Sequence, residues 1–513
     1  MIEAWQQFYA AADVRELDRR AIEDHGIPGY TLMQRAAAAA WQTARRAWGL
    51  PDRLVVFCGS GNNGGDGYEI ACLAHADGVA VEVRELGGER RGDAATARAA
   101  WLQRGAISDA TDRPIPPPAP APPGDVGYAE SVWVVDALFG TGLTRAVEGE
   151  AAAAIACIQA AHGAGARVLA LDVPSGHIAD TGQALGPAVQ ADMTVTFIAD
   201  KVGLHTSAGA AAAGSVHCAG LQVPAEIFDG VRPRARRLDP RHLRSFFPPR
   251  ARDAHKNRHG HVLIIGGAPG MAGAALLAGR AALRSGAGLV SVATHPTHAA
   301  MFSMAQAELM VHGVDEAVAL APLLERATVV AIGPGLGQGD WSRCLFQAAL
   351  GVERPLVLDA DALNLLAQQP MQLGEAVLTP HPGEAARLLG REGGATVEAD
   401  RLHALQALEA RYDCTALLKG LGTLVSAESP DDPPWLCTAG NPGMAVGGSG
   451  DVLTGVVAAC IAQGMPPARA ARAAVLAHAY AGDLAAHHGE RGMLPSDLVD
   501  HLRAAVNPRQ GSA

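Results

Sequence analysis

Several features that mark particular protein classes are scarce in this sequence. Charged residues make up only 18% of the 513 residues and aromatic residues only 4%, while hydrophobic residues reach 49%. Disordered chains have the opposite balance, so we expect a folded protein. Asp and Glu outnumber Lys and Arg by 52 to 41, a net charge of −11, which argues against nucleic acid as a partner.

Cysteines are few and scattered along the chain. There is no CxxC pair, which argues against a zinc site or a disulfide framework and favours buried thiols in a reducing cytosol. The first twenty residues place Glu3 before any basic residue and contain no apolar core, so we expect no signal peptide and a cytoplasmic location. The eight cysteines are Cys58, Cys72, Cys157, Cys218, Cys344, Cys414, Cys437 and Cys460.

Long hydrophobic runs are also missing, with one exception. Residues 259–279 carry no Asp, Glu, Lys or Arg, and the stretch is long enough to reach across a bilayer. Several glycines and Pro269 interrupt it, however, and predict a strand, a turn and a helix. We therefore expect no membrane span and no membrane partner.

The length predicts two or three domains. Two halves show α/β alternation, and a seam rich in Arg and Pro at residues 231–237 separates them. We place the boundary at this seam, which gives domains of residues 1–238 and 239–513. A second Pro-rich segment, residues 114–123, lies inside the first half, and we interpret it as a semi-rigid surface loop without an assigned role.

Short apolar runs without alternation recur in the first half, as in strands buried on both faces of a parallel sheet. The first run meets a glycine-rich segment, Gly59–Gly67, and then a helix through Ala74, which together indicate a βαβ unit. Ligands bind beyond the carboxyl ends of such strands, where Asp136 and Asp172 also fall. The predicted strands are 54–58, 79–83, 132–136 and 167–172.

The second half shows the same alternation of strands and helices, and it is mainly helical from Asp451 onward. This pattern predicts another doubly wound α/β domain. Its predicted strands are 261–265, 288–293, 328–332, 355–358, 376–378, 414–418 and 422–425.

The segment Gly59–Gly67 reads GSGNNGGDG, with five glycines between a strand and a helix. Glycines let the backbone approach a ligand closely, and the amides of a helix start can hold a phosphate. The segment matches neither GxGxxG nor a Walker loop, so a plain glycine turn remains the alternative. The polar residues Asn62, Asn63 and Asp66 favour a binding site.

Two strand ends of the first half carry carboxylates. Asp136 precedes a glycine turn in DALFGTGLTR, and Asp172 precedes Ser175 in LDVPSG. Oxygen ligands of this kind suit a hard cation, and a carboxylate beside a sugar or a ring can move a proton. Each aspartate taken singly fits equally well as a cap or turn residue.

The motifs of both halves resemble one known family. GSGNNGGDG, VVDALFGTGL, LDVPSG and TFIADKVGL resemble the epimerase domain of the bifunctional NAD(P)H-hydrate repair enzymes. HKNRHGHVLIIGG, IGPGLG, VLDADALN, LTPHPGEAARLLG, LLKGLGTLV and GNPGMAVGGSGDVLTG resemble the ribokinase-like dehydratase domain of the same family. The resemblance covers nearly the whole chain in the expected order.

The resemblance implies an α/β fold of two doubly wound domains, an amino-terminal Rossmann-like three-layer sandwich and a carboxy-terminal ribokinase-like domain. It implies an isomerase that interconverts the R and S forms of hydrated NADH and NADPH at nicotinamide C6. It also implies a lyase that dehydrates the S form with ADP (or ATP) and releases AMP (or ADP) and phosphate. K+ and Mg2+ are the implied cofactors, and we expect a homo-oligomer.

The resemblance carries site residues of the epimerase to this chain. Asp172 would transfer the proton and touch the substrate, and a potassium ion would lie on Asn63, Asp136 and Ser175. The phosphates and ribose of the substrate would contact Asn62, Asn63, Gly64, Gly65 and Asp66. The remaining lining would be Gly140, Thr141, Gly142, Leu143, Thr144, Arg145 and Ala146.

For the dehydratase, Gly447–Asp451 opens a helix whose amides can stabilise a transferring phosphoryl group, and Asp451 can take the proton of the substrate hydroxyl. The implied substrate contacts are Ala274, Gly335, His381 and Asp451. The implied nucleotide contacts are Lys419, Gly420, Leu421, Gly422, Thr423 and Gly450. Family members often carry Ser and Tyr in the turn that here reads GGAPGMAGA, residues 266–274, which leaves the finer substrate contacts open.

Two other readings stay open at this point. The chain could be a ribokinase-like kinase for a vitamin precursor with a non-catalytic amino-terminal binding domain, or its front half could be a binding or assembly module. Asn63, Asp136, Asp172 and Ser175 together argue against a module without activity. The sequence does not decide between ADP and ATP.

Overall fold

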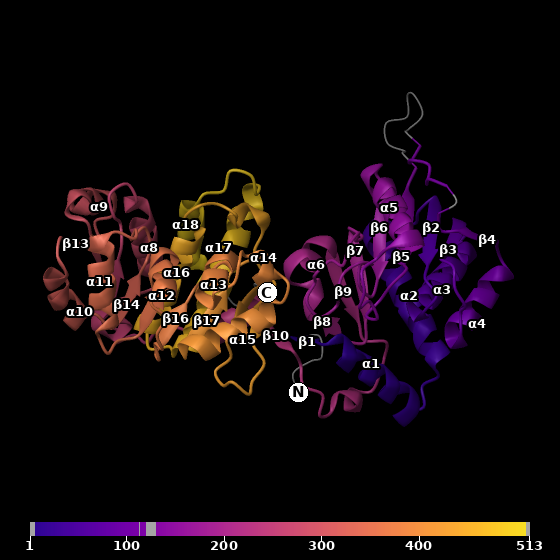
Figure 1. Cartoon of the computed structure of the whole chain (residues 1–513), viewed down its shortest axis with the longest axis horizontal. Helices are drawn as coiled ribbons and strands as arrows, with labels where there is room; N and C mark the ends of the chain where they lie inside the picture. The colour runs from indigo at the N-terminus through magenta and orange to yellow at the C-terminus, as the bar shows by residue number, and fades with distance from the viewer. Residues whose placement is uncertain (1–5, 112, 120–129, 509–513) are drawn as a thin grey trace. The chain divides into compact units, whose positions relative to one another are not determined.

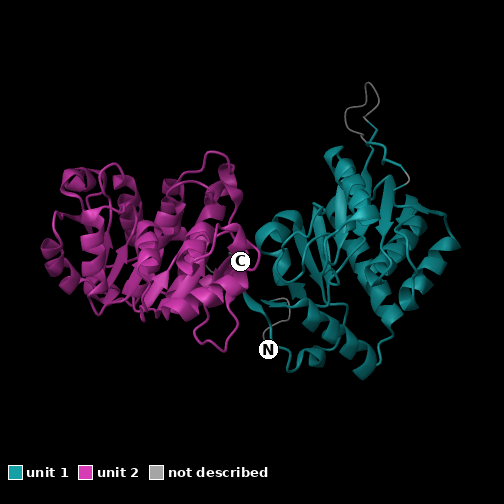
Figure 2. Cartoon of the chain, viewed as in Figure 1, with its two compact units in different colours: residues 1–236 teal, residues 237–513 magenta. Residues whose placement is uncertain are grey.

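The structure is a computed structural model that describes residues 6–111, 113–119 and 130–508. It divides into two compact units, residues 1–236 and 237–513, which Figure 2 colours teal and magenta. The seam expected at 231–237 is partly regular structure, since β10 (Ala235–Leu238) begins within it. Of the Pro-rich segment, residues 120–123 lie outside the described residues.

A parallel sheet of seven strands forms the centre of unit 1 (Figure 1). Its order is β4-β3-β2-β5-β6-β7-β9, and every neighbouring pair is parallel. The strands are β2 (Arg53–Cys58), β3 (Ala80–Glu85), β4 (Ile107–Asp109), β5 (Val132–Ala137), β6 (Arg167–Leu171), β7 (Met193–Phe197) and β9 (Ser215–Ala219).

Helices cover both faces of this sheet, and alternate residues of β2 show why. Val56 packs in a core that includes Ala40 and Ile70 of two helices, while Phe57 packs in a second core with Ile158. Unit 1 is therefore a three-layer sandwich. Its helices are α1 (Ala11–Arg19), the π-helix Arg20–Asp24, α2 (Gly29–Trp48), α3 (Asn62–Ala76), α4 (Gly92–Leu102), α5 (Gly149–Gly163) and α6 (Ser207–Ala212); β1 (Gln7–Tyr9) pairs with β8 (Asp200–Lys201).

Unit 2 contains a mixed sheet whose strands follow the order β13-β12-β11-β14-β15-β16-β17-β18-β19. The pairs from β13 to β17 are parallel, and β18 and β19 add antiparallel neighbours. These strands are β11 (His261–Ile265), β12 (Leu289–Thr294), β13 (Met310–Gly313), β14 (Val329–Ile332), β15 (Leu356–Leu358), β16 (Ala376–Leu378), β17 (Thr415–Leu418), β18 (Thr423–Val425) and β19 (Trp435–Cys437).

The helices of unit 2 place its polar motifs around a buried central helix, α16 (Ser449–Ala462). Val452 and Val456 of α16 belong to one core with Ala278 of α8, so the apolar character of this helix on all sides reflects burial. The other helices are α7 (Leu243–Phe246), α8 (Ala272–Arg284), α9 (Ala299–Ala305), α10 (Ala321–Arg326), α11 (Asp340–Leu350), α12 (Ala360–Gln368), α13 (Pro382–Leu389), α14 (Ala395–Glu398), α15 (Arg401–Tyr412), α17 (Pro467–Ala485) and α18 (Pro495–Ala505).

The expected α/β class with two sheets is confirmed. One local expectation differs: the segment Gly59–Gly67 is not a loop throughout, because α3 begins at Asn62 and includes its last three glycines. A side chain on Gly64 would meet the carbonyl oxygen of Gly59 at 2.0 Å, so glycine permits this close turn from strand to helix. Among the described residues, no helix is both long and apolar enough to cross a membrane.

Candidate active sites

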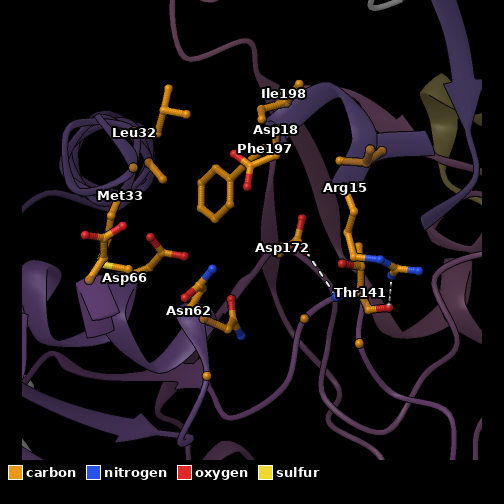
Figure 3. A pocket seen from close by; sticks show the side chains of 18 of the residues that line it. Arg15, Asp18, Leu32, Met33, Asn62, Asp66, Thr141, Asp172, Phe197 and Ile198 are labelled. Atoms are coloured by element: carbon orange, nitrogen blue, oxygen red, sulfur yellow. Dashed lines mark hydrogen bonds between the residues drawn. The ribbon is translucent and has the colours of Figure 1, made fainter. Parts of the chain in front are cut away.

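A cavity of about 450 Å³ opens at the carboxyl end of the unit 1 sheet. Figure 3 shows Asn62, Asp66 and Asp172 around it, with Phe197 also in its lining. Asn62, Asn63, Asp66, Gly140, Thr141, Gly142, Leu143 and Asp172 are expected site residues that line it. Gly64 and Gly65 lie in the first turns of α3, and Thr144, Arg145 and Ala146 are not among the lining residues.

Asp172 follows β6 directly and has a left-handed backbone with φ +65°, which few residues other than glycine adopt. Its Oδ1 lies 2.5 Å from the ammonium nitrogen of Lys201 and accepts a hydrogen bond from Thr196. Its Oδ2 accepts the amide hydrogen of Thr141, the contact drawn in Figure 3. Strand, lysine and glycine turn thus fix both carboxylate oxygens at the cavity wall.

Lys201 itself is almost entirely buried, with 1% of its side chain exposed. Besides Asp172, its ammonium donates to the hydroxyl of Thr196 and the carbonyl of Phe197. Three acceptors for three hydrogens compensate the burial of this charge. The sequence analysis did not single out Lys201.

Asp18, Asp66 and Asp93 also line this cavity. Asp66 is 8% exposed, and burial raises its pKa well above the ordinary value, with Asp172 and Asp18 adding to the shift. Burial also raises the pKa of Asp18, which belongs to α1, and Asp172 again contributes. The cavity therefore holds carboxyl groups in different environments, the arrangement that separates proton donors from acceptors.

Two of the three expected potassium ligands, Asp136 and Ser175, are buried and hydrogen-bonded to each other. Asp136 is fully buried and accepts hydrogen bonds from the amide and hydroxyl of Ser175, at 2.7 and 2.6 Å. Burial raises the pKa of Asp136 to about 6, although these bonds lower it. The side-chain amide of Asn63 is buried with no hydrogen-bond partner in the described part of the chain. An orphaned amide oxygen and a buried carboxylate suit a hard monovalent cation.

The second site surrounds the start of α16. Gly448 precedes this helix with φ +102°, and a side chain there would meet Leu277 at 2.8 Å and Pro495 at 3.0 Å. The first amides of α16 have no partner within the helix and carry its positive dipole end. Asp451 lies in this first turn, as expected.

Charged side chains from three other elements gather at this helix end. Lys419, just after β17, donates to Oδ1 of Asp359 at 2.8 Å, and Glu384 of α13 lies 4.0 Å from the same ammonium. A Cβ built on Gly450 would lie 3.1 Å from the Lys419 Nζ, which puts this ammonium over the first turn of α16. The structure thereby brings Lys419 close to Gly450 and Asp451, three of the predicted site residues.

Burial raises the pKa of Asp451 to about 7, and the negative charge of Asp359 adds to this effect. Lys419 acts in the opposite direction. A carboxyl group with this pKa can accept a proton near neutral pH and return it, which a general base requires.

The remaining predicted residues of unit 2 lie in three places. His381 caps α13, and its Nδ1 accepts from the amide of Gly383, while burial lowers its pKa. Ala274 and Gly335 are neighbours, since a Cβ on Gly335 would lie 3.1 Å from that of Ala274. The backbone of residues 419–422 is held by Arg401, which donates to the carbonyls of Leu418, Lys419 and Gly422.

A metal ion held entirely by protein side chains would need several ligands close together. Among the described residues, no group of three or more His, Cys, Asp or Glu could hold a metal ion. Mg2+ commonly binds through substrate phosphates and only one or two carboxylates.

Known proteins match nearly the whole chain. A family model described as YjeF-related protein N-terminus matches residues 29–203, and one described as NAD(P)H-hydrate dehydratase matches residues 262–504. The Bifunctional NAD(P)H-hydrate repair enzyme Nnr of Coxiella burnetii is 45% identical over 98% of this chain and 99% of its own. This chain belongs to the bifunctional NAD(P)H-hydrate repair enzymes. It is thus a multifunctional, nucleotide-binding enzyme of the isomerase and lyase classes.

Solved structures match the second unit. A ribokinase-like superfamily protein from Enterococcus faecalis V583 is 31% identical, with a TM-score of 0.50, over 53% of this chain and 95% of that one. An ADP/ATP-dependent NAD(P)H-hydrate dehydratase from Bacillus subtilis, co-crystallized with ATP/Mg2+, is 29% identical, with a TM-score of 0.46, over 52% and 96%. The Enterococcus protein confirms the ribokinase-like fold that the sequence predicted for the second half.

Three residues at these sites were missed by the sequence analysis: Asp18, Lys201 and Asp359. Lys201 and Asp359 stand in quoted motifs, TFIADKVGL and VLDADALN; Lys201 follows Asp200, and Asp359 directly follows an apolar stretch. A charged residue in that position is a detectable signal for a buried partner. Asp18 lies on α1, outside the residues of the family match, and carries no such signal.

Proposed function

We propose that residues 1–238 epimerise hydrated NADH and NADPH and that residues 239–513 dehydrate the S epimer with ADP or ATP, releasing AMP or ADP and phosphate. The observation that carries this proposal is the first turn of α16, where Asp451 and the ammonium of Lys419 lie at a helix start. Epimerase and dehydratase together would repair both forms of the damaged cofactor.

In the epimerase, Asp172 would exchange protons with the hydroxyl at nicotinamide C6 as this group leaves one face and water adds to the other. The ion pair with Lys201 would orient the carboxylate, and Asn62 to Asp66 would bind ribose and phosphates with the turn at residues 140–146. A potassium ion held by Asn63, Asp136 and Ser175 would supply a fixed positive charge beside the substrate.

In the dehydratase, Asp451 would take the proton of the C6 hydroxyl as this oxygen attacks the terminal phosphorus of the nucleotide. Lys419, Gly450 and the amides of α16 would stabilise the negative charge on the transferring phosphoryl group. The C6–O bond then breaks with phosphate as leaving group, and loss of a proton from C5 restores the dihydropyridine ring. Ala274, Gly335 and His381 would bind the substrate, and residues 419–423 the nucleotide.

The decisive assay supplies the purified chain with hydrated NADH and ADP, and separately with ATP, and follows the return of NADH absorbance. We expect a return with at least one nucleotide above the enzyme-free rate. No return with either, together with phosphorylation of a vitamin alcohol, would favour the kinase reading instead. A homo-oligomer and a cytoplasmic location stay predictions.

A further inference from the structure

Asp359 carries a carboxylate whose burial needs an explanation: it is 1% exposed and directly follows β15. It occupies the N-cap position of α12, yet its side chain makes no capping hydrogen bond with that helix. Capping, the ordinary structural role of an aspartate here, is therefore not what holds it.

The two oxygens of Asp359 instead join two other elements. Oδ1 accepts from the ammonium of Lys419 at 2.8 Å, and Oδ2 accepts from the hydroxyl of Thr454 at 2.7 Å. Thr454 lies one turn beyond Gly450 in α16. One buried carboxylate thus connects the end of β15, the residue after β17 and the first turns of α16.

We propose that Asp359 is a positioning residue of the dehydratase: it holds the Lys419 ammonium against the first turn of α16, where the phosphoryl group is transferred, and sets the charge around Asp451. This inference rests on the function proposed above for unit 2. It assigns to Asp359 no contact with substrate, because its oxygens accept hydrogen bonds from Lys419, Thr454 and Thr379.

The distances explain why Lys419 needs such a partner. Lysine has four flexible side-chain bonds, so an ammonium without a fixed acceptor samples many positions. Here Asp359 and the more distant Glu384 are its two anions, and Gly450 leaves the space that the ammonium occupies. Burial alone would lower the pKa of Lys419, but these carboxylates raise it above its ordinary value, so the ammonium stays charged.

The charges that face Asp451 come from three elements. Asp359 and Asp361 stand at the start of α12, Glu384 belongs to α13, and Lys419 follows β17. Among them Asp359 makes the largest charge contribution, after burial, to the raised pKa of Asp451. Without Asp359, the pKa of Asp451 would be lower. The Lys419 ammonium would also move toward the remaining carboxylates, which lowers the pKa of Asp451 further.

The test is a comparison of Asp359→Asn with wild type in the full-length chain, using the S epimer of hydrated NADH and varied ADP. Losing one partner of a buried charge pair weakens binding by about 30-fold or more, which we expect in the KM for ADP. The acid limb of the kcat profile should move to lower pH. A role confined to folding would not shift this limb.

Two variants calibrate the result. Thr454→Val leaves the ion pair with Lys419 intact, so we expect a smaller rise in KM, about 2- to 10-fold. Glu353→Gln makes the same carboxylate-to-amide change at an exposed residue before β15 and should match wild type. Epimerase activity, measured in the same preparations, should be equal in all of them.

A double-mutant cycle keeps the inference testable if Asp359→Asn alone does not fold. Asp359→Asn/Lys419→Met removes both buried charges, which proteins tolerate better than the loss of one. If Asp359 acts through Lys419, the KM for ADP of the double variant equals that of Lys419→Met. Additive effects, or an Asp359→Asn enzyme with a KM within about twofold of wild type and an unmoved acid limb, would overturn the inference. Wild-type chain that restores no NADH would instead overturn the proposed function.

Discussion

Each unit has one aspartate as its expected catalytic residue, Asp172 after β6 and Asp451 in the first turn of α16, and the surroundings of the two carboxyl groups differ. Asp172 has a lysine of its own, since Lys201 contacts it at 2.5 Å within a buried set of acceptors. Asp451 shares Lys419 with Asp359 and Glu384, and burial leaves its pKa near 7. The comparison shows two ways to place an aspartate in a site. A direct ion pair, as between Asp172 and Lys201, fixes the carboxylate. Where the lysine instead pairs with a second carboxylate, as Lys419 does with Asp359, the pKa of the first aspartate stays raised and it can be protonated near neutral pH.

The largest effect should come from Asp451→Asn. Removing a general base costs up to about 10⁴-fold in rate, so we expect dehydration of the S epimer to fall by roughly 10³ to 10⁴. Epimerisation should keep its wild-type rate, which serves as the internal control. Single-turnover formation of NADH measures the first quantity, and a dehydratase rate within tenfold of wild type would disprove the role of Asp451.

Asp172→Asn is the corresponding substitution in unit 1 and should affect the other activity. We expect epimerisation to fall by roughly 10² to 10³, because an amide keeps the shape of the side chain and loses its basicity. Chromatographic separation of the R and S forms over time measures this rate. The assignment is wrong if this variant epimerises as fast as the wild-type enzyme.

Lys201→Met tests whether the direct ion pair stabilises unit 1 as well as orienting Asp172. Breaking a buried pair typically costs about 3 kcal/mol, since it leaves an uncompensated charge. We expect a lower midpoint of chemical unfolding for unit 1 and an epimerase rate reduced with it. Equal stability and equal rate would show that the buried contact has no role.

The pH dependence should separate the two activities further. A base with a pKa of about 7 is protonated below that pH. The dehydratase rate should therefore fall as the pH drops below about 7, and at still lower pH by about tenfold for each pH unit. A kcat profile between neutral and mildly acidic pH measures the midpoint. A dehydratase that stays at full rate well below pH 7 would contradict the environment described for Asp451.

The smallest expected effect concerns the glycine turn opposite Asp172. A Cβ on Gly140 would lie 3.0 Å from Oδ2 of Asp172 and 3.6 Å from the amide carbon of Asn63. Gly140→Ala should therefore raise the KM of the epimerase by about fivefold. Gly163→Ala, where the added Cβ meets nothing within 4 Å, is the matched control and should leave it unchanged.

Sequence patterns predicted the strands that carry apolar runs and missed the residues whose role depends on partners far away in the sequence. The buried apolar runs located β2, β5 and β6 within a residue or two, because strands covered on both faces are apolar throughout. The three-residue β19 (Trp435–Cys437) was missed, although the equally short β16 (Ala376–Leu378) was predicted.

Among the site residues, too, those in local motifs were predicted and those defined by distant partners were missed. Asp172 and Asp451 were predicted from motifs at a strand end and a helix start, where chain direction alone exposes a side chain. Lys201 and Asp359 were missed because their importance lies in partners 29 and 60 residues away in the sequence. Only the folded sheets bring those charges within contact distance.

The most direct measurement supplies a mixture of R and S hydrated NADH with ADP and follows the recovery of NADH absorbance. The account predicts that wild type converts the whole mixture, that Asp172→Asn initially stops at the S fraction, and that Asp451→Asn recovers none above the enzyme-free rate. Complete recovery by Asp172→Asn at the wild-type rate, or any rapid recovery by Asp451→Asn, would contradict the division of labour between the two aspartates.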